Sequence, residues 1–423
     1  VLFYPPKKLW KNENPTVMVF AQQHGNEPSG KEALLMFLQE IRSQPGNRYF
    51  ENLNLILLPM VNPDGNEAHR RRNNNGVDLN RNHVILTEPE TQLLHALFEK
   101  YRPHVTLDVH EYGGGTWLED GYIKDLGEQL DCLSNPAIPR ELKDFALDKI
   151  LWPTIESTRA RGVKSNRYLI TKGSPLDYVR NSTTDIDDGR NSFGIQHTLS
   201  FIVEGLNGWS KEDRIWQRGK HQLTLIQSFL TTCNENAEDI VSLVQNVREE
   251  LGSNPPDSIF IEGTYFAEDS KPLDVTLIQT SDMREKTVTL PEYRAEPKAV
   301  TAVKRPAGYI IEAPGEALLV LVKNHFFPHE ILASKKKFTV EEFRFTGSDT
   351  LHHEGRDTIV PAGAFHKMKK TFSKGSLFIP AGNIHATQIV QIFEPRSFYG
   401  LSHYEEYQDL LNDGIYRVYR VLK

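Results

Sequence analysis

The sequence has few cysteines, no long apolar run and no excess of basic residues. Only Cys132 and Cys233 occur among 423 residues, too few for a disulfide framework or a cysteine-based zinc site. Without a run of about 18 apolar residues, no membrane-spanning helix is predicted. Basic residues number 49 and acidic residues 56, so the net charge of −7 does not favour nucleic-acid binding. The chain opens on Val1 without an initiator Met or a visible signal peptide, as expected of a processed or trimmed product.

Strand-like and helix-like segments alternate through the first 250 residues. Short apolar runs predict strands at 16–20, 53–60, 105–110 and 199–204. Helical periodicity predicts helices at 31–41, 89–101, 142–160, 214–230 and 237–251, with a kink or break at Pro153. This alternation predicts an α/β fold with a mixed, mainly parallel sheet flanked by helices.

The pattern changes after residues 252–257, which are all turn formers. Beyond them, short β-like runs recur at 260–265, 275–278, 309–311, 338–345, 377–379 and 389–393, with one helix predicted at 316–327. We therefore predict a catalytic domain at 1–252 and a β-rich accessory domain at 258–423.

Potential metal ligands lie where the predicted strands end. His24 and Glu27 occupy the turn after the first strand, His110 ends the third, and Glu204 ends the strand at 199–204. Ligands of open α/β sheets bind beyond the carboxyl ends of the strands. Two imidazoles and a carboxylate with an open position suit a catalytic zinc ion. Glu204 could then take a proton from a metal-bound water.

The polar segment 70–82 supplies arginines that such a site needs. A guanidinium near the reacting carbonyl stabilises an oxyanion. The planar, forked guanidinium also binds a substrate carboxylate better than a lysine does.

Together these motifs resemble the zinc carboxypeptidase family of carboxypeptidase A, in particular bacterial-type members with a C-terminal accessory domain. The motifs are His24-x-x-Glu27, Asn62-Pro63-Asp64-Gly65, Arg71 before Gly76-Val77-Asp78-Leu79-Asn80-Arg81-Asn82, Asp108-x-His110 and Phe201 to Glu204. The resemblance covers residues 15–210. It implies one Zn²⁺ held by His24, Glu27 and His110, with Glu204 as general base. It further implies Arg71 as oxyanion stabiliser, Asn80 and Arg81 as carboxylate binders, and Asp78 as the partner of a ligating His.

The function expected from this resemblance is hydrolysis of the C-terminal peptide bond of peptides with a free carboxylate. The loop Asp185–Asn191 lies where the family binds the terminal side chain, and it holds three Asp and Arg190. Amine and carboxylate recognition together point to diaminopimelate, hence to cell-wall peptides. Two alternatives stay open: a zinc-dependent deacylase of N-acyl amino acids related to aspartoacylase, and a catalytically silent binding module. The sequence gives no oligomeric state, and the resemblance favours a secreted or periplasmic location.

Some features depart from the family pattern or stay ambiguous. His110 is followed by Glu111-Tyr112, where the family usually has Ser or Thr. Tyr178 is a candidate for the mobile tyrosine that caps the substrate, and the alternative is an ordinary surface tyrosine. Spacing to Asn80 favours Arg71 over Arg72 as the oxyanion stabiliser.

Overall fold

The computed structural model describes residues 1–43, 50–113, 117, 119–171, 173–208, 214–353 and 356–423. The chain divides into two compact units. The first unit comprises residues 1–83, 101–245 and 265–297, and the second comprises 84–100, 246–264 and 298–423. The domain limits expected from the sequence, 1–252 and 258–423, stay a prediction.

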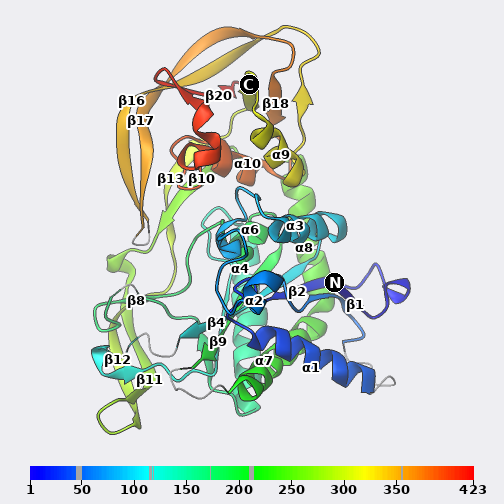
Figure 1. Cartoon of the computed structure of the whole chain (residues 1–423), viewed down its shortest axis with the longest axis vertical. Helices are drawn as coiled ribbons and strands as arrows, with labels where there is room; N and C mark the ends of the chain where they lie inside the picture. The colour runs from blue at the N-terminus through cyan, green and yellow to red at the C-terminus, as the bar shows by residue number, and fades with distance from the viewer. Residues whose placement is uncertain (44–49, 114–116, 118, 172, 209–213, 354–355) are drawn as a thin grey trace. The chain divides into compact units, whose positions relative to one another are not determined.

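A seven-stranded sheet forms the centre of the first unit (Figure 1). Its order is β1 (Leu2–Tyr4), β3 (Asn54–Leu58), β2 (Thr16–Ala21), β4 (Val105–Gly113), β9 (Leu199–Asn207), β6 (Glu128–Cys132) and β7 (Ser165–Arg167). Neighbours are parallel except at β1–β3 and β9–β6. The predicted mixed, mainly parallel sheet is therefore confirmed.

The central strands are apolar because both faces of the sheet are covered. Every residue of β2 and β3 is buried, as expected for parallel strands between helical layers. The helices of this unit are α1 (Ser29–Ser43), α2 (Pro63–Glu67), α4 (Arg140–Phe145), α5 (Trp152–Ala160), α6 (Gly189–Gly194), α7 (Ile215–Glu235) and the first half of α8 (Ala237–Ser253). Helix α7 packs against α1 and α5, while α6 lies against β4 and β9.

The helix predicted at 142–160 is continuous but distorted. A π-helical segment, Ala146–Leu151, joins α4 to α5 immediately before Pro153. A proline cannot donate the backbone hydrogen bond of a helix interior, and a wider turn accommodates its ring. The irregularity expected at Pro153 is therefore present one turn earlier.

A second, four-stranded sheet also belongs to the first unit. Its order is β5 (Tyr122–Ile123), β11 (Lys271–Gln279), β12 (Arg284–Arg294) and β8 (Val179–Arg180). Val275 and Leu277 of β11 pack with Leu290 of β12 around the buried ring of Trp117. The β11–β12 hairpin therefore shares a hydrophobic core with residues of the N-terminal half of the chain.

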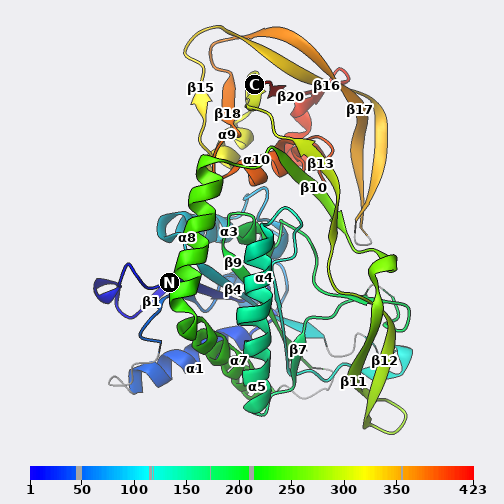
Figure 2. The same ribbon diagram turned by 180° about the vertical axis from the view of Figure 1, so that it is seen from behind.

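The second unit is rich in β-structure (Figure 2). It contains α3 (Pro89–Tyr101) up to Lys100, the second half of α8, and the pair β10 (Ser258–Thr264) and β13 (Lys298–Lys304). A further sheet runs in the order β15 (Glu330–Ile331), β18 (Leu377–Pro380), β14 (Gly308–Ile311), β20 (Ile415–Val421), β16 (Lys336–His353) and β17 (Arg356–Phe372), with β19 (Leu411–Asn412) beside β20. Helices α9 (Glu316–Asn324) and α10 (Ala386–Phe393) complete it. Among the described residues, no helix is long and apolar enough to cross a membrane.

One predicted strand of this unit is wrong. Residues 389–393 belong to helix α10, all of whose residues are buried. A short run of apolar residues reads the same in a buried helix as in a buried strand, because neither alternates with polar residues.

Candidate metal and active site

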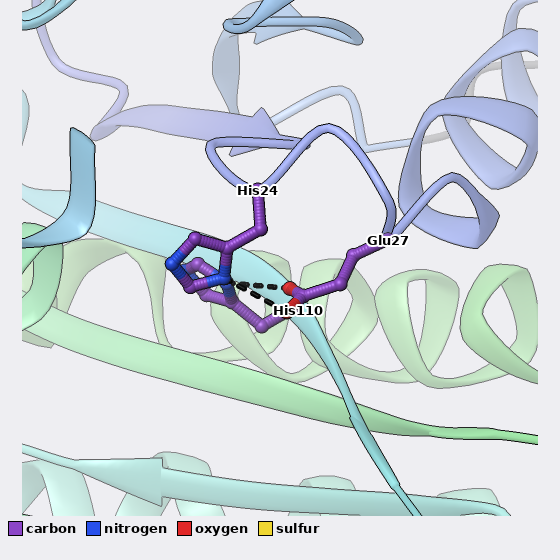
Figure 3. Close-up of side chains that lie close together, drawn as sticks. All are labelled: His24, Glu27 and His110. Carbon is purple, nitrogen blue, oxygen red and sulfur yellow. Dashed lines mark hydrogen bonds and ion pairs between the residues drawn. The ribbon is translucent and has the colours of Figure 1, made fainter. Parts of the chain in front are cut away.

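His24, Glu27 and His110 converge at the carboxyl ends of β2 and β4. His24 and Glu27 lie on the turn between β2 and α1, and His110 lies within β4. His24 Nδ1 is 2.8 Å from Glu27 Oε1, and His110 Nδ1 is 2.9 Å from Glu27 Oε2. The two Nδ1 atoms are 3.1 Å apart, and all three residues are buried. Figure 3 shows the three side chains directed toward one another.

The opposite nitrogen of each imidazole faces a carboxylate. His24 Nε2 is 3.1 Å from Asp78 Oδ1, and His110 Nε2 is 2.9 Å from Asp108 Oδ1. A carboxylate at Nε2 fixes the hydrogen on that nitrogen and leaves the lone pair on Nδ1. Burial alone would lower the pKa of His110, but the charges of Asp108 and Glu27 raise it overall.

The arrangement fits a tetrahedral metal ion. The candidate ligand atoms lie within 4.8 Å of one another. Ligand atoms about 2.05 Å from a tetrahedral zinc lie about 3.3 Å apart, close to the separations found here. Two oriented imidazoles and one carboxylate form the donor set of catalytic zinc sites, which keep a fourth position for substrate or water.

Glu204 lies beside this cluster on β9. It is the register partner of His110 on the adjacent parallel strand, and it is buried. Burial and the charge of Glu27 raise the pKa of Glu204, the charges of His110, His24 and Lys124 lower it, and the net result is a pKa of about 7. Burial raises the pKa of Tyr168 well above its usual value, and the charge of the neighbouring Glu204 raises it further. Among the described residues Glu204 forms no ion pair with an arginine. Its presence at this position is therefore not explained by a structural Arg–Glu pair.

Arg71 projects toward the same cluster. Its Nε donates to Asp78 Oδ2 at 2.9 Å, and its Nη1 lies 3.2 Å from His24 Nδ1 and 3.6 Å from Glu27 Oε1. The side chain is 45% exposed, so a substrate could reach it. Arg72 instead donates to the carbonyl of Gly76 at 2.8 Å and is exposed. Of these two arginines, the structure therefore brings Arg71 to the histidine–glutamate cluster.

Asn80 and Arg81 lie on the short 3₁₀ helix η2 (Leu79–Arg81). Asn80 is buried, and its Oδ1 accepts from Gly189 N at 2.7 Å and from Gln23 Nε2 at 3.2 Å. The Arg81 side chain is 37% exposed, with Nε 3.9 Å from Asp187 Oδ1. Burial opposes its charge, but Asp187 and neighbouring carboxylates raise the pKa of Arg81. Asn80 thus holds the surrounding loops together, while Arg81 stays a charged and partly accessible group.

Tyr178 and Arg190 have structural contacts of their own. The Tyr178 ring lies 4.3 Å from the Arg294 guanidinium carbon of β12. Arg190 is fully buried, donating to the carbonyl of Cys132 at 3.0 Å and pairing with Asp188 at 3.2 Å. Arg190 is therefore not placed to bind a substrate carboxylate, and that part of the diaminopimelate argument loses its support.

The structure explains the acidic residue that follows His110. Glu111 Oε2 accepts from Ser29 N at the start of α1 at 3.1 Å, and Oε1 accepts from Arg218 Nη1 at 2.8 Å. Burial raises the pKa of Glu111 to about 7 despite Arg218. Glu111 therefore caps the helix that follows the His24 turn.

Sequence reasoning missed Lys124 and Tyr168. Lys124 is buried, donates to the carbonyl of Leu169 at 2.7 Å, and lies 4.4 and 5.6 Å from the ring centroids of Tyr112 and Tyr168. No motif marks either residue, since both belong to loop regions that reach Glu204 only in the folded chain. The position of Asp108 beside His110 could be predicted from the Asp108-x-His110 spacing, because residues two apart on a strand point to the same face of the sheet.

Known proteins resemble this chain in sequence. Residues 4–148 match the family model described as zinc carboxypeptidase. Carboxypeptidase 2 of Trichophyton tonsurans is 22% identical over 396 residues, which cover 88% of this chain and 70% of that protein. Carboxypeptidase 2 of Trichophyton equinum is 26% identical over 234 residues, which cover 52% of this chain and 42% of that protein. This chain therefore spans less than half the length of the second relative.

Among solved structures, a metallo-carboxypeptidase from Pseudomonas aeruginosa matches at 20% identity with a TM-score of 0.40. The match covers 55% of this chain and 59% of that one. The family match at residues 4–148 includes the His24-x-x-Glu27 and Asp108-x-His110 motifs. Residues 4–148 therefore match a zinc carboxypeptidase domain, and the relatives found by sequence are named carboxypeptidases.

Proposed function

We propose that this chain is a zinc-dependent carboxypeptidase that removes the C-terminal residue of peptides with a free carboxylate. The observation that carries the proposal is the convergence of His24 Nδ1, His110 Nδ1 and the Glu27 carboxylate. Carboxylates behind both imidazoles orient these nitrogens for a metal. Zinc held by these three residues would polarise the substrate carbonyl and lower the pKa of a water to about 7.

The roles of the neighbouring residues follow from their positions. Glu204 accepts a proton from the attacking water and later donates it to the leaving amine. Burial raises the pKa of Glu204 above the usual value of a glutamate, which favours a carboxyl group that can both accept and return a proton. Arg71, held by Asp78, donates to the oxyanion of the tetrahedral intermediate.

Arg81 is the proposed partner of the terminal carboxylate. It is partly exposed and keeps its charge beside Asp187. A planar guanidinium recognises a carboxylate through two parallel hydrogen bonds. Asn80 supports this site by fixing Gly189 and Gln23, and we assign it a positioning role beside any contact with substrate.

Substrate preference is proposed at the level of the side-chain class. The carboxylates of Asp185, Asp187 and Asp188 lie close enough to Arg81 for their charges to raise its pKa, and they contribute a negative potential to this region. Such a potential favours a terminal residue that bears an amine, as in Lys, Arg or diaminopimelate. Cell-wall peptides stay one candidate source of such residues. Tyr178 stays a candidate capping residue, although its ring packs against Arg294 here.

Mass spectrometry of reaction products tests the proposal. The substrates are matched peptides ending in Lys, Glu, Phe or diaminopimelate, each with a free or an amidated terminus, together with N-acyl amino acids. We expect chelator-sensitive loss of one C-terminal residue from free-carboxylate peptides, and none from amidated ones. Glu204→Gln should bind zinc as the wild type does and lose activity.

Other outcomes would assign a different function. Cleavage of N-acyl amino acids alone would identify a deacylase. Zinc binding without turnover of any of these substrates would contradict the carboxypeptidase and favour a binding role. A clear preference for a terminal Phe would refute the proposed preference for amines.

A further inference from the structure

A cavity of about 520 Å³ lies in the first unit between β7 and β11, apart from the candidate metal site. We call it the β7–β11 cavity. Its walls include two runs of consecutive residues, 162–166 and 274–278. Successive side chains of a strand point to opposite faces of its sheet. Consecutive lining residues therefore show that the edge of β11, with its backbone groups, forms one wall.

Within the described part of the chain, the edge of β11 that faces away from β12 is open along residues 274–277. Among the described residues, β11 pairs on that side only with β5, at Ile278 and Gln279. Thr280 N donates to the carbonyl of Gly121, beside β5. Backbone groups of antiparallel strands point to alternate sides, so the N–H and C=O of Thr276 and Asp274 also point to this open side. They form a row of donors and acceptors that another strand could pair with.

The opposite wall is the edge strand β7. Of the described strands only β6 pairs with it, through Glu128 N to the carbonyl of Lys164 and Tyr168 N to the carbonyl of Leu130. By the same alternation, the backbone of Ser165 points away from β6. Ser165 is 3% exposed, and its Oγ has no hydrogen-bond partner within the described part of the chain. A buried hydroxyl without a partner is costly unless a ligand or water satisfies it.

Charged side chains around the cavity carry a net negative charge. Asp125, Asp274 and Glu285 line it, against Arg159 and Lys164. Lys164 Nζ lies 2.8 Å from Asp125 and also pairs with Glu285, so one ammonium serves two carboxylates. Arg159 Nε is occupied by the carbonyl of Ser165 at 2.7 Å. Positive charge on a ligand would complement this surface.

We propose that the β7–β11 cavity binds an extended, positively charged peptide segment, which adds to the open edge of β11 as a further strand. Strand addition supplies affinity through main-chain hydrogen bonds and specificity through alternate side chains. Residues 274–277, which lie before the pairing with β5, offer an unpaired edge about 10 Å long, at about 3.3 Å per residue. The proposal does not depend on the peptidase activity, because no residue of the metal site lines this cavity.

Fluorescence anisotropy with a labelled peptide tests the proposal. The probe is Thr-Lys-Val-Lys-Val-Lys-Thr with an amidated C-terminus, which an exopeptidase that needs a free carboxylate does not cleave. We expect saturable binding that a chelator does not change and that salt weakens. Thr276→Pro removes one donor of the open edge and should weaken binding about tenfold. Thr276→Ala keeps the backbone N–H and should bind within about twofold of the wild type.

Two further measurements keep the test independent of protein folding. A probe N-methylated at alternate amides cannot form a strand ladder, and it should bind wild-type protein at least about tenfold more weakly. A probe with Glu in place of Lys should also bind more weakly. Equal binding of the methylated and unmethylated probes, or no binding of any probe, would overturn the proposal. Loss of binding on chelation would overturn it as well, by placing the peptide at the metal site.

Discussion

Asp78→Asn is expected to weaken zinc binding although the change is nearly isosteric. The Asp78 carboxylate accepts from three donors: His24 Nε2 and Asn80 N, each 3.1 Å from Oδ1, and Arg71 Nε, 2.9 Å from Oδ2. Burial by itself would raise its pKa, but His24 and Arg71 hold the pKa of Asp78 well below the usual range. An amide has one acceptor oxygen, so the variant can keep either the donors at the Oδ1 position, His24 and Asn80 N, or the donor at the Oδ2 position, Arg71.

Each orientation of the amide has a different cost. If the amide oxygen stays with Arg71, its NH₂ faces His24 Nε2 and favours the tautomer with hydrogen on Nδ1, the proposed ligating atom. If the oxygen stays with His24, Arg71 loses its hydrogen bond to residue 78 and, among the described residues, keeps only Glu27 as an oppositely charged neighbour. Loss of such an outer partner typically weakens metal affinity about 10- to 100-fold, equivalent to about 1.4–2.7 kcal/mol.

Competition with a chromophoric zinc chelator at pH 7.5 measures this loss directly. Asp64→Asn is the matched control, because Asp64 is exposed on α2 and lies on the same segment of chain. Asp64→Asn should bind zinc as the wild type does. If orientation of the imidazole is the mechanism, Asp78→Asn should be at least as damaging as Asp78→Ala. Wild-type zinc affinity in Asp78→Asn would refute the reasoning.

Three further predictions concern catalysis, pH and metal removal. Arg71→Met should lower kcat about 100- to 1,000-fold while Arg72→Met stays near wild type, and equal losses in steady-state kinetics would contradict the assignment. Burial lowers the pKa of Lys124 to about 7, below the unfolded value of about 10.4, so the unfolded chain binds more protons between these values. Stability of the metal-free protein should therefore rise with pH in that window, by at most about 1.4 kcal/mol per unit from this residue, and urea unfolding of Lys124→Met should lack that component. Zinc at about 100 times its dissociation constant should stabilise the wild type by about 2.7 kcal/mol and His110→Ala much less, and equal shifts in thermal melting would place the metal elsewhere.

The sequence predicted the clustering of the proposed metal ligands because parallel strands end at a common edge. His24 and Glu27 follow β2, His110 lies near the end of β4, and Glu204 lies on β9. Strands β2, β4 and β9 are neighbours in the sheet, so residues distant in sequence meet. Each strand could be predicted from a short apolar run, and its end from the polar residues that follow, so the position of each proposed ligand followed from the nearby sequence.

Other parts of the site depend on tertiary structure that no local pattern encodes. Tyr168 reaches Glu204 from the segment after β7, and Lys124 reaches the same region from the segment after β5. Neither residue lies at a strand end that the sequence pattern predicts. The hydrogen bonds of Asn80 were also unpredictable, since its partners Gln23 and Gly189 lie 57 and 109 residues away.

The same limit explains the unexpected place of the β11–β12 hairpin. Its strand β11 was expected within a separate β-rich domain. Val275 and Leu277 instead pack around Trp117, and Tyr293 bonds to Asn181 at 3.0 Å. The change in sequence pattern at residues 252–257 predicts where the type of secondary structure changes. It does not predict which strands share a hydrophobic core, and the core around Trp117 contains residues from both sides of that segment.

The carboxylates near the proposed metal site differ in whether they have an oppositely charged partner. Asp78 is paired with Arg71, Glu111 with Arg218, and Asp108 with His110. Glu128 and Glu204 form no ion pair among the described residues, and burial raises the pKa of both. A buried acid without a direct ion pair is protonated up to a higher pH, and for Glu204, whose pKa is about 7, this allows the carboxyl group to accept and return a proton near neutrality. Only Glu204 of these two is the register partner of His110, so it alone combines that property with a position beside the proposed metal ligands.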